Sequence, residues 1–172
     1  MTAIIIYGFM NVYKVKYTLM KILIVSDSHR NDELLYGLVK EYPKMDLYLH
    51  AGDSQSFAEG IFPFDSCLGN CDSYPFMEKR FFRTEYGNIL MKHFPHLNEE
   101  EKKDIRIFIY GHTHRYAVYE AEDILFVNPG SISLPRDNSN GSFAILTLEK
   151  EHINVDVIDI FTKNILTSYQ IL

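Results

Sequence analysis

Residues 21–29 read KILIVSDSH, an apolar run that ends in an Asp-x-His pair. The run Lys21–Ser26 has the length of a strand and no alternation of polar and apolar residues, so it predicts a central β-strand covered on both faces. Asp27 and His29 follow where that strand must end. Side chains two residues apart in an extended or turning backbone point the same way, so this pair could hold one ion. Alone, the pair is a weak signal.

Similar polar residues follow other apolar runs. They are Gly52-Asp53, Gly69-Asn70, His93 and the sequence Gly111-His112-Thr113-His114. With Asp27 and His29 they provide seven oxygen or imidazole ligands, which is more than one ion takes. We therefore predict two divalent metals sharing one carboxylate. Asp53 suits that bridging position, because its two oxygens can face two metals. Such a pair suits the attack of activated water on phosphorus.

The ligand assignments differ in specificity. His112 and His114 form the most specific piece, because two histidines on a loop directly after an apolar strand are seldom core residues; imidazoles suit Mn, Fe, Zn or Ni. Asp53 and Asn70, taken alone, are as readily explained as turn residues after glycine. His93 ends the run NILMK, and His96 is its rival. We expect His93 to be the ligand, because Pro95 turns His96 away.

Two further histidines are interpreted as having no metal role. His50 lies within a strand before the Gly-Asp turn, and His152 lies in a hairpin. The two cysteines, Cys67 and Cys71, are too few for a disulfide framework and indicate a reduced cytoplasmic protein. The chain of 172 residues is long enough for one domain with a good core, and its net charge of −6 argues against a generic nucleic-acid binder.

The remaining patterns predict an α/β fold. Asn31-Asp32-Glu33 is a helix start, and apolar residues on one helical face continue to Pro43. Strands are predicted at 46–50, 79–84, 88–92, 105–110, 116–121, 124–127, 142–148 and 153–160, and a short polar helix at 98–103. Strand and helix alternate in the first half, and the second half is mostly antiparallel. This order favours two packed sheets with helices outside.

Residues 1–19 form the unusual part of the chain. The apolar stretch Ala3–Met10 is too short to span a bilayer, and it lacks the features of a signal peptide. We interpret 1–19 as an N-terminal extension upstream of a natural start at Met20, with the domain at 20–172. The alternative is an extra strand at the edge of the sheet.

In this order, the motifs SDSH, GD, GNCD, His93, GHTH and NPGS resemble those of the calcineurin-like metallophosphoesterases, most closely the small YfcE-type phosphodiesterases. The resemblance covers Met20 to about Asp156. It implies a four-layer α/β/β/α sandwich of two mixed sheets. It also implies that Asp27, His29 and His114 hold a first metal, that Asn70, His93 and His112 hold a second, and that Asp53 bridges them.

The implied function is metal-dependent hydrolysis of a small phosphodiester by a hydroxide that bridges two divalent metals, with Mn first and Fe, Zn or Ni as alternatives. Asp53, Asn70 and Cys71 are the candidate catalytic residues. Arg136 is a candidate clamp for the substrate phosphate, although a solvated surface arginine explains it equally well. The loop Asn128–Ser131 is interpreted as structural support for the histidine loop. We expect no membrane partner. Nucleic acid is a disfavoured partner, and a homo-oligomer is compatible with the sequence.

The chain departs from the family pattern at two positions. Many relatives in the wider superfamily have a histidine, taken as the general acid, where this chain has Cys71, and a thiol is the poorer proton donor near neutrality. In addition, His93-Phe94-Pro95-His96 replaces a common His-Gly-His, and Phe94 is expected to narrow the pocket. A second reading is a protein-interaction scaffold of the same fold, like the retromer subunit. The enzyme reading is preferred, because such scaffolds typically lose ligands and this chain keeps all seven.

Overall fold

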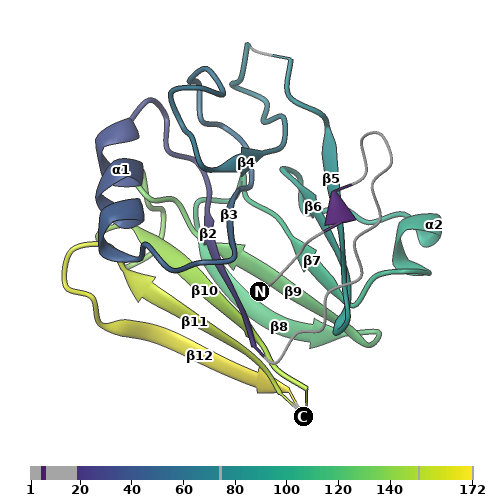
Figure 1. Ribbon diagram of the computed structural model, residues 1–172. Coiled ribbons are helices and arrows are strands. Elements are labelled where there is room, and N and C mark those ends of the chain that lie inside the picture. The colour runs from purple at the N-terminus through teal and green to yellow at the C-terminus, as the bar shows by residue number, and fades with distance from the viewer. Residues whose placement is uncertain (1–4, 7–18, 74, 151, 172) are drawn as a thin grey trace.

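Two six-stranded sheets form the protein (Figure 1). The computed structural model describes residues 5–6, 19–73, 75–150 and 152–171. The first sheet has the order β1(Ile5–Ile6)-β5(Lys79–Thr84)-β6(Gly87–Lys92)-β7(Ile107–Ile109)-β9(Ile124–Pro129)-β8(Tyr116–Ala121). The second has the order β12(Ile165–Ile171)-β11(Ile153–Asp159)-β10(Ser142–Leu148)-β2(Met20–Val25)-β3(Leu47–His50)-β4(Asp65–Ser66). The helices are α1(Asp32–Glu41) and α2(Glu99–Lys102).

Both sheets are mixed, and their parallel strands determine where loops gather. In the second sheet β2, β3 and β4 are parallel. In the first sheet β6, β7 and β9 are parallel. The carboxyl ends of β2, β3, β6 and β7 lie at the same end of the sandwich, which is the upper end in Figure 1. Loops that are far apart in sequence therefore meet there.

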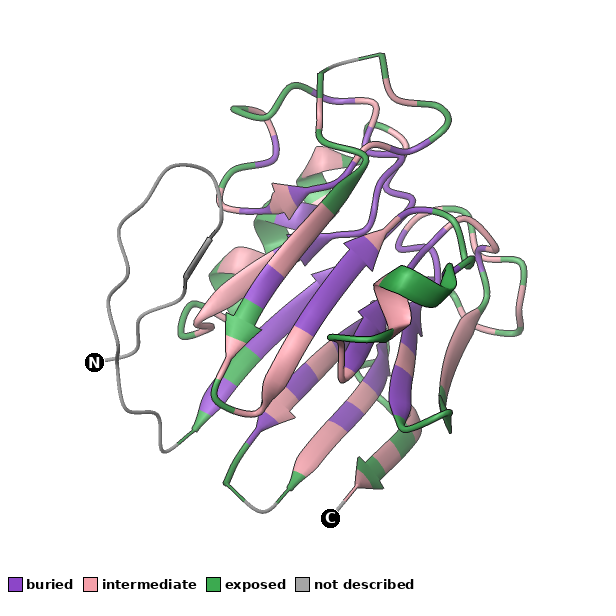
Figure 2. Ribbon diagram, turned by 90° about the vertical axis from the view of Figure 1, so that its right-hand side faces the viewer, coloured by how far each residue is buried: buried purple, intermediate pink, exposed green. Residues whose placement is uncertain are grey.

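The core has three layers of apolar packing. The main cluster lies between the sheets and includes Ile22 and Ile24 of β2 and Ile107 and Ile109 of β7, all fully buried. A second cluster joins Leu23 of the same strand to helix α1 on the outer face. Both faces of β2 are thus covered, as its unbroken apolar sequence predicted. Figure 2 shows the buried strand centres in purple.

The two helices follow the signals in the sequence. Helix α1 starts at Asp32, carries acidic residues in its first turn, and buries Leu35 and Leu38. In α2, Asn98 caps the helix and exchanges hydrogen bonds with Glu101 as a capping box. A third apolar cluster on the outer face of the first sheet includes Leu97 and Phe108. The α/β/β/α sandwich predicted from the sequence is confirmed, with a thin outer layer on the α2 side.

Some elements were not predicted, or have other bounds. β12 and the two-residue β4 were missed, β7 covers only Ile107–Ile109, and β9 extends to Pro129. Within 1–19, Ile5–Ile6 pair with Phe82 and Arg83 of β5 at the sheet edge. Residues 1–4 and 7–18 lie outside the described residues, so the extension and the domain boundary at Met20 stay predictions. No helix in the described ranges is long and apolar enough to cross a membrane.

Candidate metal centre

All seven predicted ligands lie on loops that follow strands at the upper end of the sandwich (Figure 1). Asp27 and His29 follow β2, Asp53 follows β3 and Asn70 follows β4. His93 follows β6, and His112 and His114 follow β7. The parallel direction of these strands within each sheet brings residues from 27 to 114 to one place.

These side chains form two groups joined by Asp53. In the first group, His114 Nε2 lies 3.1 Å from Asp27 Oδ1 and 3.5 Å from His29 Nε2. In the second group, Asn70 Oδ1 lies 3.0 Å from His93 Nε2 and 2.8 Å from His112 Nδ1. Asp53 Oδ2 is 3.4 Å from His93 Nε2. The grouping is the one that the family resemblance implies.

The first group has the donor chemistry of a cation site. His114 Nδ1 lies 2.7 Å from the carbonyl oxygen of Leu134, which can only accept, so Nδ1 carries a proton. The other ring nitrogen, Nε2, faces Asp27 Oδ1. Apart from this imidazole, the described residues offer no hydrogen-bond donor to the buried Asp27 Oδ1. A buried carboxylate oxygen in this position is costly unless a cation faces it.

The second group repeats this arrangement. His93 Nδ1 lies 2.8 Å from the carbonyl oxygen of Ala51, which fixes the proton on that nitrogen. Its Nε2 faces the oxygens of Asn70 and Asp53. Burial alone would lower the pKa of His93, but hydrogen bonds to Asp53 and Ala51 raise it above its usual value. The surrounding acceptors thus favour positive charge at this nitrogen, and a divalent cation would supply it.

The two aspartates have opposite pKa shifts. Burial raises the pKa of Asp27 and outweighs the lowering effect of the Ser26 hydroxyl and the nearby imidazoles. Burial also acts to raise the pKa of Asp53, but hydrogen bonds from His93 and Cys71 lower it by more than burial raises it. The net shift is downward. Asp53 is therefore ionised at neutral pH, as a bridging carboxylate needs to be.

Left-handed backbone geometry recurs at the centre. Five of the seven predicted ligands have positive φ: Asp27 at 53°, His29 at 46°, Asp53 at 60°, His112 at 67° and His114 at 58°. Non-glycine residues in this conformation cost free energy and persist where surrounding contacts enforce them, most often at functional sites. Gly52, predicted to let the chain turn before Asp53, has a φ of +92°.

Asp72 organises these loops, and the sequence reasoning missed its role. Its carboxylate accepts hydrogen bonds from the backbone N–H groups of Asp53 at 2.9 Å, Gly69 at 2.8 Å and Gln55 at 2.6 Å. The loops after β3 and β4 are thereby joined. Gly69 also allows close approach, because a Cβ there would lie 2.1 Å from Asp53 Oδ1. The only signal in the sequence was the acidic residue after Asn70-Cys71.

The loop Asn128–Ser131 supports the histidine loop, as predicted. Asn128 Nδ2 donates to the carbonyl oxygen of Gly111 and to Thr113 Oγ1, both at 3.0 Å. Ser131 Oγ donates to the backbone oxygen of Asp27 at 2.8 Å. These contacts hold the backbone on either side of the candidate ligands.

Other predicted residues are placed as follows. His93 is buried and His96 is exposed, consistent with the choice of His93. The ring of Phe94 lies 4.6 Å from the ring of His112, beside the centre where narrowing was expected. Arg136 is exposed, and its backbone N–H donates to the His114 carbonyl oxygen at 2.8 Å. Its role as a phosphate clamp stays a prediction.

His50 and the two cysteines differ in how far they are buried. His50 is fully buried and lies 2.9 Å from Ser28 Oγ through its Nε2, which agrees with a structural role. Both cysteines are free thiols, Cys67 buried and Cys71 exposed. Partial burial and the nearby Asp53 carboxylate raise the pKa of Cys71.

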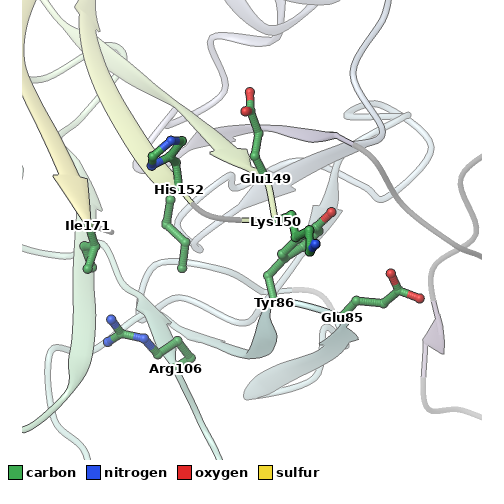
Figure 3. Close-up of a pocket in the computed structure, with 8 residues that line it drawn as sticks. Glu85, Tyr86, Arg106, Glu149, Lys150, His152 and Ile171 are labelled. Carbon is green, nitrogen blue, oxygen red and sulfur yellow. The ribbon is translucent and has the colours of Figure 1, made fainter.

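One cavity lies beside this centre and another lies far from it. A cavity of about 560 Å³ begins beside it and is lined by Arg30, Gln55 and Phe57 among others; Gln55 Oε1 is 3.2 Å from His29 Nδ1. The other, of about 250 Å³, lies at the opposite end, where Tyr86, Arg106 and His152 line it (Figure 3). Within the described residues, the side-chain groups able to hold a metal all belong to the first end.

Comparisons with known proteins find similar sequences and folds. The family model of the calcineurin-like phosphoesterase superfamily domain matches residues 20–151. The chain is 32% identical over 155 residues to the probable metallophosphoesterase YsnB of Bacillus subtilis, covering 81% of this chain and 91% of that protein.

Two solved structures share the fold. The phosphoesterase YfcE from E. coli superposes with a TM-score of 0.72 at 20% identity, covering 87% of this chain and 98% of that one. A Vps29 variant from Entamoeba histolytica superposes with a TM-score of 0.67 at 17% identity, covering 88% of this chain and 98% of that one.

Proposed function

The chain belongs to the calcineurin-like phosphoesterase superfamily, and from this we propose that it hydrolyses a small phosphodiester at a centre for two divalent metals. The observation that carries the proposal is the convergence of imidazole nitrogens and carboxylate oxygens in two groups, with Asp53 close to ligand atoms of both His29 and His93. Buried donors of these kinds are the ones that divalent metals prefer.

We assign the first cation to Asp27, His29 and His114, and the second to Asn70, His93 and His112, with Asp53 reaching both. Two divalent cations bound there would lower the pKa of a water molecule and offset the negative charge of the phosphate. Imidazole and carboxylate donors suit Mn, Fe, Zn or Ni, and Mn is our first candidate.

The protein's own residues would position the substrate. Gln55 and Arg30 line the cavity beside His29, so this cavity is the natural place for an organic group on the ester. The ring of Phe94, which is tilted against that of His112, would limit the space on the other side. Arg136 follows the His114 loop, and we propose that its guanidinium binds a phosphate oxygen.

The experiment is a metal titration followed by an assay. Protein stripped with chelator and reloaded with Mn²⁺ should hold close to two equivalents by elemental analysis, and should then cleave an aryl phosphodiester. The matched control is Asp53→Asn, which keeps the shape of the side chain but weakens the bridge. A wild-type protein that retains one tight equivalent, or none, would contradict the two-metal centre.

A scaffold without catalysis is the alternative. The likeness to Vps29 shows the fold alone, at 17% identity. The seven converging side chains favour the enzyme. A protein that holds two metals and yet cleaves neither diesters nor monoesters would support the scaffold.

A further inference from the structure

Cys71 lies beside the candidate metal centre, next to His29 and Asp53. One potential ligand atom from each of these three residues lies within 4.8 Å of the other two. His29 also belongs to the group with Asp27 and His114. The sulfur therefore lies beside His29, which we assign to the first cation, and beside Asp53, which we assign to both.

The position of the sulfur is set by the loop around it. The backbone N–H of Cys71 donates to Asp53 Oδ1 at 2.7 Å. The amide of Asn70 donates to the sulfur through Nδ2 at 3.2 Å, which leaves Oδ1 of Asn70 facing His93 and His112. The neighbouring Asp53 and Asn70 are thus in contact with Cys71 at both its backbone and its thiol.

A second observation concerns Asp27, which shares a candidate metal-binding group with His29. Apart from the imidazole of His114, the described residues offer no hydrogen-bond donor to the buried Asp27 Oδ1. His29 thus belongs to two candidate groups, one with Asp27 and His114 and one with Asp53 and Cys71, whose members lie on different loops.

We propose that Cys71 is an additional ligand, as a thiolate, of the cation held by Asp27, His29 and His114. This inference rests on the proposed metal centre. On binding, the S–H proton passes to solvent and a sulfur–metal bond forms, with no change of oxidation state. A soft thiolate donor strengthens the preference for Zn²⁺ or Co²⁺ over Mn²⁺ at this position, whereas the second position has no sulfur donor to add to that preference.

The experiment uses Co²⁺ as a spectroscopic probe. Metal-free full-length protein is titrated with Co²⁺, and its absorption spectrum is recorded. Visible d–d bands report the occupied centre, and a near-ultraviolet charge-transfer band reports a thiolate–cobalt bond. We expect both in the wild type. Cys71→Ser should keep the d–d bands and lose the charge-transfer band, and Cys67→Ser, the matched control, should keep both.

The outcomes separate the inference from the proposed function. Wild-type d–d bands without the charge-transfer band would overturn thiolate ligation and leave the metal centre standing. Absence of both would overturn both. A charge-transfer band that survives in Cys71→Ser and disappears in Cys67→Ser would also overturn the inference.

Alkylation provides a second readout that does not depend on cobalt. Cys71 is exposed, so iodoacetamide should modify it in metal-free protein, whereas buried Cys67 should stay unmodified. Zn²⁺ should protect Cys71, and Cys71→Ser should weaken Zn²⁺ binding by about tenfold or more relative to Mn²⁺. Equal labelling of Cys71 with and without Zn²⁺ would count against ligation.

Discussion

His93 and His96 have different surroundings although only two residues separate them. His93 is buried and its Nδ1 contacts the Ala51 carbonyl oxygen, whereas His96 is exposed. Replacing His93 by Ala should remove one metal equivalent and lower activity by at least ~100-fold, because even outer contacts of metal ligands are worth ~10–100-fold. His96→Ala should stay within about twofold of wild type. Metal content and the rate on an aryl diester check this, and the reverse result would mean that His96 is the ligand.

The residue after Asn70 should decide which leaving groups the protein can release. Cys71 is a poor proton donor at neutral pH in either state: partial burial and Asp53 raise the pKa of the free thiol, and the metal-bound thiolate that we propose carries no proton. Activated aryl diesters, whose leaving group departs unprotonated, should be cleaved far faster than alkyl diesters. Cys71→His should help chiefly the alkyl esters, because general acid catalysis typically contributes ~10²–10⁴-fold. The measurement is the aryl-to-alkyl rate ratio, and an unchanged ratio would show that proton donation does not limit the reaction.

Six of the seven predicted ligands could be read from the sequence because they follow an apolar strand, whereas Asn70 follows the short polar strand β4. The residues that position these ligands could not be predicted from the sequence. Asp72 is important because three backbone N–H groups converge on it, and that convergence depends on the shape of two loops. A single acidic residue after Asn70-Cys71 does not indicate it.

At the scale of elements, apolar runs in the sequence predicted the buried strands. Strand β12, at the edge of its sheet, was harder to predict. β2 was predicted because both of its faces are covered, so its sequence is continuously apolar. β12 is an edge strand with half-buried and exposed residues, and its sequence ILTSYQI mixes polar and apolar positions. The order of strands was beyond the sequence patterns, because β2 pairs with β10, more than a hundred residues later. The pattern of elements favoured two packed sheets, and the family resemblance implied the four-layer sandwich.

The end of β3 makes the fold sensitive to acid through His50. Burial lowers the pKa of His50 to about 4, well below its usual value of 6.5. The unfolded chain therefore binds a proton that the folded protein excludes, so stability is complete above pH 6.5 and declines as the pH falls towards 4. The loss from this group should approach about 3 kcal/mol, since each pKa unit is worth ~1.4 kcal/mol.

Urea unfolding of chelator-treated protein at several pH values between 4 and 7.5 measures this decline. His50→Gln should flatten the profile, and His96→Gln, at an exposed position, should leave it unchanged. If wild type and His50→Gln have the same dependence on pH, another group causes the acid sensitivity.

At the scale of the whole molecule, the sandwich and the metal centre should both be independent of residues 1–19. All seven candidate ligands lie after Met20, and the family model matches from residue 20. Among the described residues of 1–19, only Ile5–Ile6 pair with another strand. They form β1 at the edge of the sheet and pair with β5. A chain that starts at Met20 should therefore fold, hold the same number of metal equivalents and keep the wild-type rate. Its free energy of unfolding should fall by no more than about 2 kcal/mol, the worth of a few edge hydrogen bonds.

Unfolding of the full and shortened chains, with metal content measured on the same samples, tests this. The edge of β5 would become open to pairing with another chain, so the test includes the oligomeric state by light scattering. A shortened chain that folds and hydrolyses normally but associates would show that Ile5–Ile6 protect the edge. A shortened chain that is insoluble, or that holds fewer metal equivalents, would show that the extension is part of the domain, because loss of an edge strand alone cannot reach a centre built at the ends of β2, β3, β6 and β7.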